Sequence, residues 1–392
     1  MYNKLGKENE VQLAKLDAEK MIGYLQAKAD QDMHFHGKFT YDCGRRLENL
    51  FWADSRCRSD YAQFGNVLSF DTTYRTDQYG KLLLVFVGVN NHFKSTIFGF
   101  AVLVDESGET YKWALATFLE CMDTVHPESV ITDGDLAMRA AIVDIMPEAV
   151  HRLCAWHIEQ NTISNIKVPG LTAVMKHFMF HHYPVEEFER RWLTTLEEYG
   201  LENNVWLTKM YERREQWADS YLRGYFFGGM TTTQRCEKMN SFLKSKVMKE
   251  MKLCDFFRGM DMALSWLRHK QSEDEYITQW TKAVTNVTNT PSIEAEATDL
   301  FTRRMFFKIR DEMKREGKYI VTSLVEDNGI ITCSISKYGN VQKARIVNYT
   351  RTTNIYFCRC NLYGSKGIPC QHIFAVLKAL HVTKFPTSLV CG

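Results

Sequence analysis

The chain has 392 residues, of which 45% are hydrophobic and 24% charged, and its formal net charge is only +2. This composition predicts a folded protein with a large core in two or three domains, and it excludes a strongly basic, histone-like binder. The longest apolar runs, such as Leu82–Val89, are far shorter than the roughly 20 residues of a membrane helix, and no apolar signal core follows Met1. We expect no membrane association, and we expect the eleven cysteines to be reduced thiols, clustered for metal binding rather than for disulfides.

An α/β core is predicted over residues 63–170, after a helical lead-in over residues 1–62. Strands are expected at 67–70, 82–89, 96–104, 129–132 and 150–154, helices at 110–125, 136–145 and 156–166, and turns at Asp77–Gly80 and Asn90–Lys94. The order β-β-β-α-β-α-β-α predicts a mixed sheet with crossover helices, which is the ribonuclease H-like arrangement. In that topology the first strand of the core lies beside the fourth.

Two aspartates follow the ends of strands that the topology makes neighbours. Asp71 closes the pattern Asn66-Val-Leu-Ser-Phe-Asp71, and Asp133 closes Ser129-Val-Ile-Thr-Asp133. Carboxylates at this edge of an open sheet face one site, where they can hold two Mg²⁺ or Mn²⁺ ions for phosphodiester cleavage. The alternative is that each aspartate only forms a turn or caps a helix.

A long helical region separates these aspartates from a third candidate carboxylate. The tryptophan- and tyrosine-rich insertion over residues 171–228 is expected to be the core of a helical bundle. Residues 229–315 are expected to complete the core with helices, the threonine run at 231–233 capping a helix that carries Glu237 in its first turns. Between Gln234 and Lys270 the sequence has nine basic and four acidic side chains. This excess fits either a phosphate-contacting face, with Arg235, Lys238, Lys244 and Lys246 nearest the acid, or a solvated helix face.

The spacing of thiols and imidazole near the carboxyl terminus predicts a metal site within a small β-rich domain at 316–392. Strands expected at 319–325, 330–336, 341–348 and 354–357 lead into Cys358-Arg-Cys360, nine residues and Cys370-Gln-His372, with a helix over 373–380. Three thiolates and one imidazole complete a tetrahedral zinc shell, which makes the zinc structural rather than catalytic.

A second Cys/His pair, Cys154 and His157, has only two ligands. Two ligands do not make a zinc site, so a buried cysteine beside a hydrogen-bonded histidine is an equally simple interpretation.

Five motifs in order resemble the plant FAR-RED IMPAIRED RESPONSE and related-sequence family, which derives from Mutator-like transposases. They are Phe70-Asp-Thr-Thr-Tyr-Arg75, Phe86-Val-Gly-Val-Asn90, Ile131-Thr-Asp-Gly-Asp-Leu-Ala-Met138, His151-Arg-Leu-Cys-Ala-Trp-His157 and Thr233-Gln-Arg-Cys-Glu-Lys-Met-Asn240. The C-terminal Cys/His motif resembles that family's SWIM zinc finger. The resemblance implies that Asp71, Asp133 and Glu237 correspond to the ancestral catalytic acids and that Cys154 and His157 form the Cys-x-x-His element.

The sequence departs from the family pattern at both ends. The WRKY-like zinc module that gives family members sequence-specific DNA binding is not in this sequence, so we do not expect direct promoter recognition by this chain. The sequence also ends soon after the finger, at Pro386–Gly392, where family members continue, which fits a truncated gene product. Cys236 stands where the family usually has serine, and this change leaves Glu237 in place.

The resemblance implies a nuclear, zinc-containing regulator of transcription in far-red light signalling that acts through DNA and protein contacts without catalysis. Its expected partners are DNA, transcription-related proteins and family members in homo- or heterodimers. An active Mutator-type transposase that uses Mg²⁺ or Mn²⁺ is the alternative, because all three acids are present. A scaffold that only binds partners is a third interpretation.

Overall fold

The computed structural model describes residues 2–73, 80–181, 183–247 and 251–390. The chain forms two compact units, each assembled from separate stretches of sequence. The first unit comprises Met1–Asn90, Lys94–Met175 and Met230–His269, and the second comprises Asn91–Phe93, Lys176–Gly229 and Lys270–Gly392. Among the described residues, no helix is both long and apolar enough to cross a bilayer.

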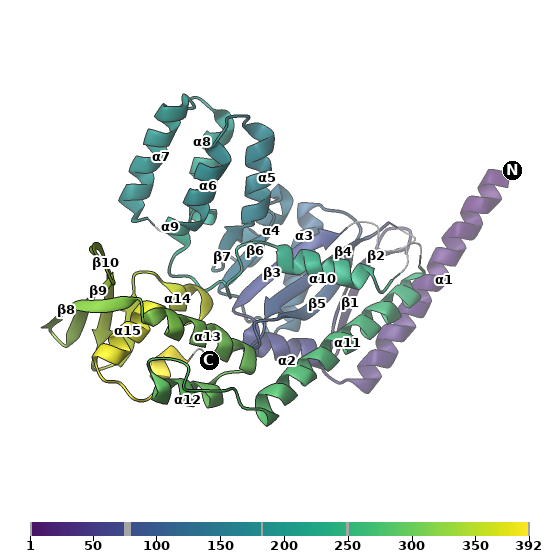
Figure 1. Cartoon of the computed structure of the whole chain (residues 1–392). Helices are drawn as coiled ribbons and strands as arrows, with labels where there is room; N and C mark the ends of the chain where they lie inside the picture. The colour runs from purple at the N-terminus through teal and green to yellow at the C-terminus, as the bar shows by residue number, and fades with distance from the viewer. Residues whose placement is uncertain (1, 74–79, 182, 248–250, 391–392) are drawn as a thin grey trace. The chain divides into compact units, whose positions relative to one another are not determined.

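A seven-stranded mixed sheet forms the centre of the first unit (Figure 1). Its strand order is β1-β2-β5-β4-β3-β6-β7, in which only the β3–β6 and β6–β7 pairs are parallel. The strands are β1 (His36–Tyr41), β2 (Leu47–Ala53), β3 (Val67–Thr73), β4 (Leu82–Val89), β5 (Ser95–Leu103), β6 (Ser129–Thr132) and β7 (Val150–Leu153). This arrangement confirms the predicted mixed sheet and places the first predicted strand, β3, beside the fourth, β6.

Helices of the first unit occur before, between and after these strands. Their bounds are α1 (Tyr2–Gln31), α2 (Ser55–Phe64), α3 (Gly108–Cys121), α4 (Leu136–Ile145), α5 (Ala155–Asn165) and α10 (Gln234–Lys244), and two further helices, α6 (Leu171–Phe180) and α11 (Leu253–Trp280), begin in this unit. The expected helical lead-in over residues 1–62 is wrong for β1 and β2. In β2 the run Leu50-Phe-Trp-Ala53 is buried on both faces of the sheet, so it lacks the alternation that marks a half-exposed strand. The expected turn at Asp77–Gly80 lies mostly outside the described residues.

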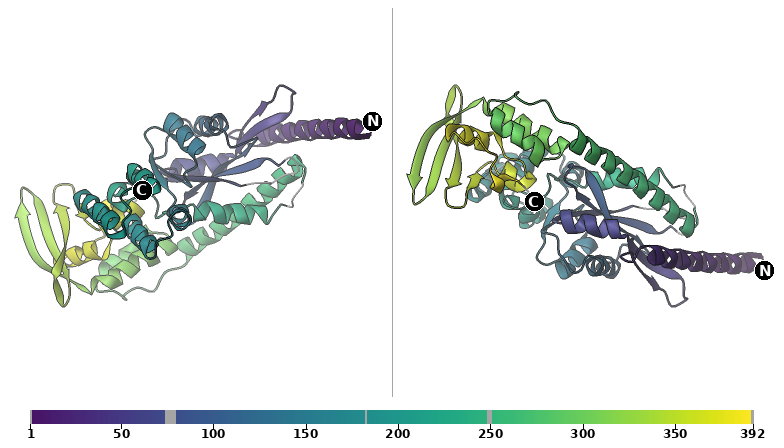
Figure 2. Two further views of the ribbon diagram at one scale, coloured as in Figure 1. Left: turned by 90° about the horizontal axis from the view of Figure 1, so that it is seen from above. Right: turned by 90° about the horizontal axis from the view of Figure 1, so that it is seen from below.

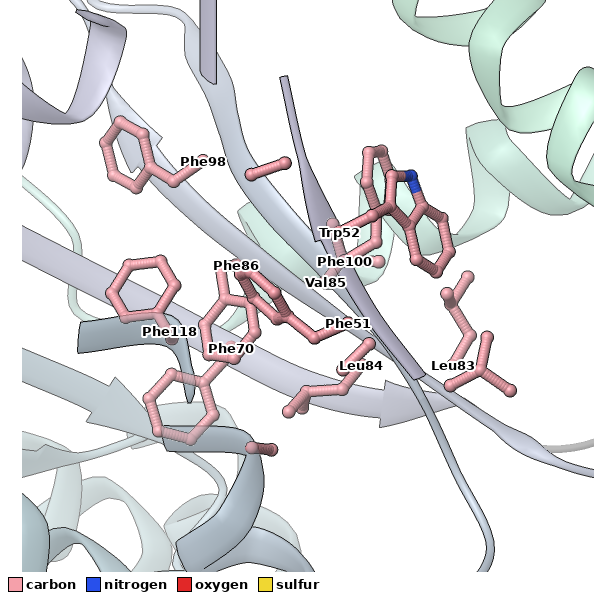
Figure 3. Close-up of a cluster of buried hydrophobic side chains, with 14 of the residues drawn as sticks. Phe51, Trp52, Phe70, Leu83, Leu84, Val85, Phe86, Phe98, Phe100 and Phe118 are labelled. Carbon is pink, nitrogen blue, oxygen red and sulfur yellow. The ribbon is translucent and has the colours of Figure 1, made fainter. Parts of the chain in front are cut away.

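Both faces of this sheet are covered by helices, and aromatic side chains show which residue points to which face (Figure 3). On one face Phe86 stacks on Phe118 of α3, with ring centroids 4.3 Å apart, and Phe51 meets the same ring edge-on. On the other face Trp52 packs against Phe257 of α11, with ring centroids 3.9 Å apart. Neighbours in β2 thus point to opposite faces, as strand geometry requires.

The second unit contains a four-stranded antiparallel sheet in the order β11-β10-β9-β8 (Figures 1 and 2). Its core joins Ile335 and Val347 of the sheet to Phe374 of α15 and to Ile309 of α13. The strands are β8 (Tyr319–Asp327), β9 (Ile330–Lys337), β10 (Asn340–Thr350) and β11 (Ile355–Cys358); the helices around them are α12 (Pro291–Leu300), α13 (Arg303–Glu316), α14 (Leu362–Lys366) and α15 (Gln371–Ala379), with a 3-10 turn at Thr387–Leu389.

From Lys176 onward the helical insertion belongs to this second unit. Its helices after α6 are α7 (Val185–Tyr199), α8 (Val205–Glu212) and α9 (Asp219–Leu222), with a 3-10 turn at Arg214–Gln216. Phe188, Trp192 and Trp217 are buried against one another, and the Trp217 indole donates to the Met210 carbonyl at 2.7 Å. The aromatic residues of the insertion therefore form a core, as predicted.

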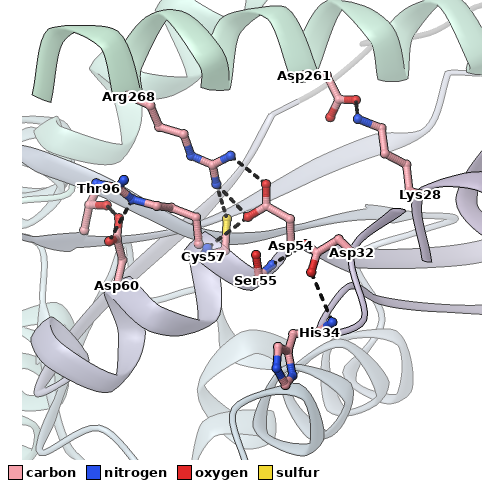
Figure 4. A network of polar contacts seen from close by, with 11 residues as sticks. Lys28, Asp32, His34, Asp54, Ser55, Cys57, Asp60, Thr96, Asp261 and Arg268 are labelled. Atoms are coloured by element: carbon pink, nitrogen blue, oxygen red, sulfur yellow. Dashed lines mark hydrogen bonds and ion pairs between the residues drawn. The ribbon is translucent and has the colours of Figure 1, made fainter. Parts of the chain in front are cut away.

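Helix α11 is fixed to the sheet unit by a paired charge (Figure 4). The Arg268 guanidinium donates two hydrogen bonds of 2.6 Å to the two carboxylate oxygens of Asp54. Asp54 also caps α2 by accepting from the Cys57 amide at 2.9 Å. Burial opposes ionisation of Asp54, but the bonds and charge of Arg268 outweigh it and lower the pKa of this carboxyl.

We expect Arg268→Ala to destabilise the chain by about 2 kcal/mol, because it leaves the Asp54 carboxylate without its counter-charge. The exposed Arg258, paired with Asp255 on the same helix, is the matched control, and Arg258→Ala should cost less than about 0.5 kcal/mol. Urea unfolding followed by circular dichroism measures both. Equal losses for the two variants would contradict a structural role for the Asp54–Arg268 pair.

Candidate acidic site and metal centre

The pairing of two parallel strands brings Asp71 and Asp133 together. Ser69 of β3 is in register with Ile131 of β6, so the residues two positions later, Asp71 and Asp133, follow as the next pair on the same face. Neighbouring strands lie about 4.8 Å apart, which brings the two carboxylates within strong electrostatic reach.

Helix α10 covers the face of the sheet to which Asp71 points. Phe70 contacts Phe86, which lies on the face covered by α3, so its neighbours Ser69 and Asp71 point to the opposite face. There the Cys236 thiol of α10 donates to Ser69 Oγ at 3.1 Å. Glu237, the next residue, is in the first turn of the same helix. Glu237 is close enough to raise the pKa of Asp71, although the helical insertion separates the two in sequence. Figure 1 shows α10 beside strand β3.

Thr233 links Glu237 to Cys154, and sequence reasoning missed this role. Its backbone N–H donates to Cys154 Sγ at 3.3 Å, and its hydroxyl lies 3.1 Å from Glu237 Oε1 and 3.4 Å from Cys154 Sγ. Thr233 occupies the N-cap position of α10 but makes no side-chain capping bond, so the predicted capping role of the threonine run is wrong for this residue. The only sign of this role in the sequence is the run of three threonines at 231–233.

Cys154 and His157 lie at the same edge of the sheet. The Cys154 amide donates to the Thr132 carbonyl at 2.8 Å, one residue before Asp133, and α5 then carries His157. Burial would raise the pKa of the Cys154 thiol, but hydrogen bonds from His157 and Thr233 outweigh it and lower the pKa. The hydrogen bond with Cys154 raises the pKa of His157 against its burial, and the negative charges of Asp133 and Asp71 add to this rise. A protonated His157 would place a positive charge beside the acids, where its charge lowers the pKa of Asp71.

The electrostatics of the acidic cluster show a site with excess negative charge. Burial, followed by repulsion from Asp133, raises the pKa of Asp71 to about 7; Glu237 adds to the rise, and His157 partly opposes it. A divalent cation would relieve this repulsion, which is the usual situation of carboxylates that bind Mg²⁺ or Mn²⁺. Asp71, Asp133 and Glu237 remain the predicted ligands of such ions.

The four basic residues predicted near the acids lie on or just after α10. Lys238, Lys244 and Lys246 are exposed, and the Lys246 ammonium lies 5.5 Å from the centre of the Phe242 ring. Arg235 is only half-exposed and has interactions of its own. Three exposed ammonium groups along one short segment are available to phosphates.

The second site lies in the C-terminal sheet unit, where three cysteines and one histidine gather. The ligand atoms of Cys358, Cys360, Cys370 and His372 all lie within 4.8 Å of one another, and among the described residues no other group of three or more such side chains is as tight. Cys358 Sγ and His372 Nδ1 are 3.7 Å apart. In a tetrahedral shell with metal–sulfur bonds of about 2.3 Å, neighbouring ligand atoms are about 3.8 Å apart, so the cluster fits one ion.

The elements around the cluster explain its geometry. Cys358 ends β11, Cys360 follows in a turn, and Cys370 and His372 lie at the start of α15. Without a cation, hydrogen bonds from the Cys358 and Cys370 thiols lower the pKa of Cys360, while the interaction with Cys360 raises the pKa of Cys358. A bound cation would favour the thiolate form of all three cysteines.

Glu312 of α13 fixes the backbone between two of the ligands. This nearly buried carboxylate accepts from the Gln371 amide at 3.0 Å, between Cys370 and His372. Glu316, one turn later, pairs with Lys378 of α15 at 3.2 Å. These glutamates were not predicted as site residues, because nothing local in α13 marks them as partners of a distant helix.

Comparisons with known proteins agree with the motifs in the sequence. Residues 67–161 match the model of the MULE transposase domain. The chain is 31% identical to Protein FAR1-RELATED SEQUENCE 5 of Arabidopsis thaliana over 97% of its own length and 48% of that protein. It is 27% identical to Protein FAR-RED IMPAIRED RESPONSE 1 of the same plant, over 95% of this chain and 46% of that protein. The chain thus spans about half the length of these relatives, and the matches confirm the resemblance.

We expect Asp71→Asn to stabilise the chain above neutral pH in buffer without Mg²⁺ or Mn²⁺. A carboxyl whose folded pKa is raised gives stability that is present below its unfolded pKa and lost as the pH rises to about 7. The difference between variant and wild type should therefore grow between about pH 4 and pH 7, reaching roughly 1–2 kcal/mol for this partly exposed group. Asp144→Asn, at an exposed carboxylate paired with Lys112, is the control and should show no such pH dependence. Parallel pH profiles for wild type and Asp71→Asn would contradict the raised pKa of Asp71.

Removal of metal should loosen the C-terminal sheet while the seven-stranded sheet persists. Metal binding contributes to the folding energy of a site whose ligands lie on separate elements, so a chelator should increase amide exchange from about Lys318 onward. Cys370→Ser should have the same effect, whereas Cys43→Ser, at an exposed cysteine of the other unit, should not. Unchanged exchange in β8–β11 after chelation would contradict a structural metal.

Proposed function

We propose that this chain, which carries a MULE transposase domain and resembles the FAR1-related plant proteins, is a transposase-derived nuclear regulator of transcription. In this proposal it acts in far-red light signalling through contacts with DNA and proteins, without catalysis. The observation that carries the proposal is the extent of the likeness. The match to Protein FAR-RED IMPAIRED RESPONSE 1 covers 95% of the chain and that to Protein FAR1-RELATED SEQUENCE 5 covers 97%. Both therefore extend well beyond the transposase domain at 67–161.

Structural zinc is the proposed metal of the Cys358, Cys360, Cys370 and His372 cluster. Thiolate and imidazole ligands in a closed four-coordinate shell favour Zn²⁺ over harder cations, and such a shell leaves no position for substrate. The zinc would join β11 to α15 and so shape the C-terminal sheet as a SWIM-type binding module.

DNA contacts are proposed for the exposed side of α10 and the residues just after it. Lys238, Lys244 and Lys246 would neutralise phosphates, with Arg235 beside them. Contacts of this kind are independent of base sequence, so sequence recognition would come from transcription-related protein partners or from homo- or heterodimers with related proteins.

A Mutator-type transposase is the second candidate, and one specific observation favours it. The three carboxylates are present together and the pKa of Asp71 is raised to about 7, as expected of a site that awaits divalent cations. Mg²⁺ or Mn²⁺ held there would activate the attacking oxygen and stabilise the leaving oxygen of a DNA strand. We rank this function second because the same carboxylates serve a regulator as ancestral structure.

A tethered reporter in plant cells tests the leading proposal. The chain is fused to a heterologous DNA-binding domain, and wild type is compared with the triple variant Asp71→Asn, Asp133→Asn and Glu237→Gln and with Cys370→Ser. We expect the triple variant to change reporter transcription as wild type does, and Cys370→Ser to lose at least half of the effect at equal nuclear protein level. Loss of the effect in the triple variant, or no effect of the wild-type fusion, would reject the proposal.

A further inference from the structure

Arg223 is a half-buried cation next to the thiol cluster. It directly follows α9 in the helical insertion, and its Nη2 atom is buried without a hydrogen-bond partner among the described residues. Burial lowers the pKa of its guanidinium, and the negative charges of Cys360 and Cys358 act in the opposite direction. A buried guanidinium nitrogen without a partner is costly, so its place demands an explanation.

Backbone hydrogen bonds hold the segment that follows Arg223 against helix α14, near the cysteine cluster. The amides of Phe227 and Gly229 both donate to the Ser365 carbonyl, each at 3.4 Å. Ser365 is in α14, which lies between Cys360 and Cys370 in the sequence. The segment after α9 is thus fixed to the loop that connects two of the metal ligands.

With a metal ion bound, the cluster would provide the negative counter-charge and the sulfur acceptors that the Arg223 guanidinium requires. A divalent ion with three thiolates and a neutral imidazole has a net charge of −1, and a buried net charge is stable only beside a counter-charge. Hydrogen bonds to ligand sulfurs are a usual form of such support around metal centres.

Two other arginines near the cluster are less suited to this role. Arg345 and Arg359 are both exposed, and they come from the strand β10 and the turn after β11, close to the ligands themselves. Solvent screens their charge, and both repel Arg223. Arg223, in contrast, is half-buried and comes from a segment that is distant in sequence from the metal ligands.

We propose that Arg223 is the electrostatic partner of the loaded Cys358, Cys360, Cys370 and His372 centre, so that metal binding fixes the segment after α9 against the finger. The inference rests on the proposed metal and not on the proposed role in transcription. Arg223 is therefore a positioning residue that couples the helical insertion to the state of the metal site.

The test measures Zn²⁺ affinity of the full chain by competition with a chromophoric chelator. Arg223→Gln should weaken binding by about 10- to 100-fold, whereas Arg223→Lys, which keeps the charge, should weaken it by less than about 10-fold. Arg190→Gln is the matched control, since Arg190 is an exposed arginine of the insertion that pairs with Glu187, and it should bind Zn²⁺ as wild type does.

Amide exchange provides a second readout that distinguishes coupling from general damage. Zn²⁺ should protect residues 219–229 in wild type and in Arg190→Gln, but not in Arg223→Gln at saturating Zn²⁺. Equal affinity and equal protection in wild type and Arg223→Gln would overturn the inference while leaving the metal centre intact. Absence of Zn²⁺ binding by wild type would overturn both the inference and the proposed metal, whatever the reporter experiment shows.

Discussion

The register between two parallel strands is the constraint on which the candidate acidic site depends. Ser69 pairs with Ile131, and this alignment puts Asp71 and Asp133 on one face of the sheet at the same edge. A slip of one residue would turn one aspartate toward the α3 face, where Phe86 and Phe118 are stacked. The fully buried residues on that face, including Phe70 and Phe86, therefore protect the geometry of the polar site on the other.

The acidic cluster destabilises the fold, and neighbouring groups partly offset this effect. Burial, followed by repulsion from Asp133 and Glu237, raises the pKa of Asp71, so ionisation of this carboxyl is unfavourable. The charge of His157 partly opposes this rise, and the Thr233 hydroxyl is hydrogen-bonded to Glu237. Clusters of this kind are common at functional sites, where stability is lower than the fold could reach. In a regulator the same groups would persist as hydrogen-bonded structure.

The features that could be predicted from the sequence are those that short stretches of sequence determine. The strands β3 to β7, the neighbouring positions of β3 and β6, and the Cys/His cluster all follow from apolar runs, turn residues and ligand spacing. The strands β1 and β2 were missed, because β2 is buried on both faces and resembles a buried helix segment. Thr233, Glu312 and Arg223 were not identifiable as site residues, because each interacts with at least one residue more than 50 positions away in the sequence. Only the folded chain brings them to their partners.

Strand transfer by the purified chain is the measurement that tests the proposed non-catalytic role most directly. The substrate is DNA that ends in the terminal inverted repeats of Mutator-like elements, with Mn²⁺ present and an active transposase of that class as positive control. We expect wild type to yield no more product than the variant with Asp71→Asn, Asp133→Asn and Glu237→Gln. Joined products that require Mn²⁺, appear with wild type and disappear in the triple variant would contradict it and establish the chain as an enzyme.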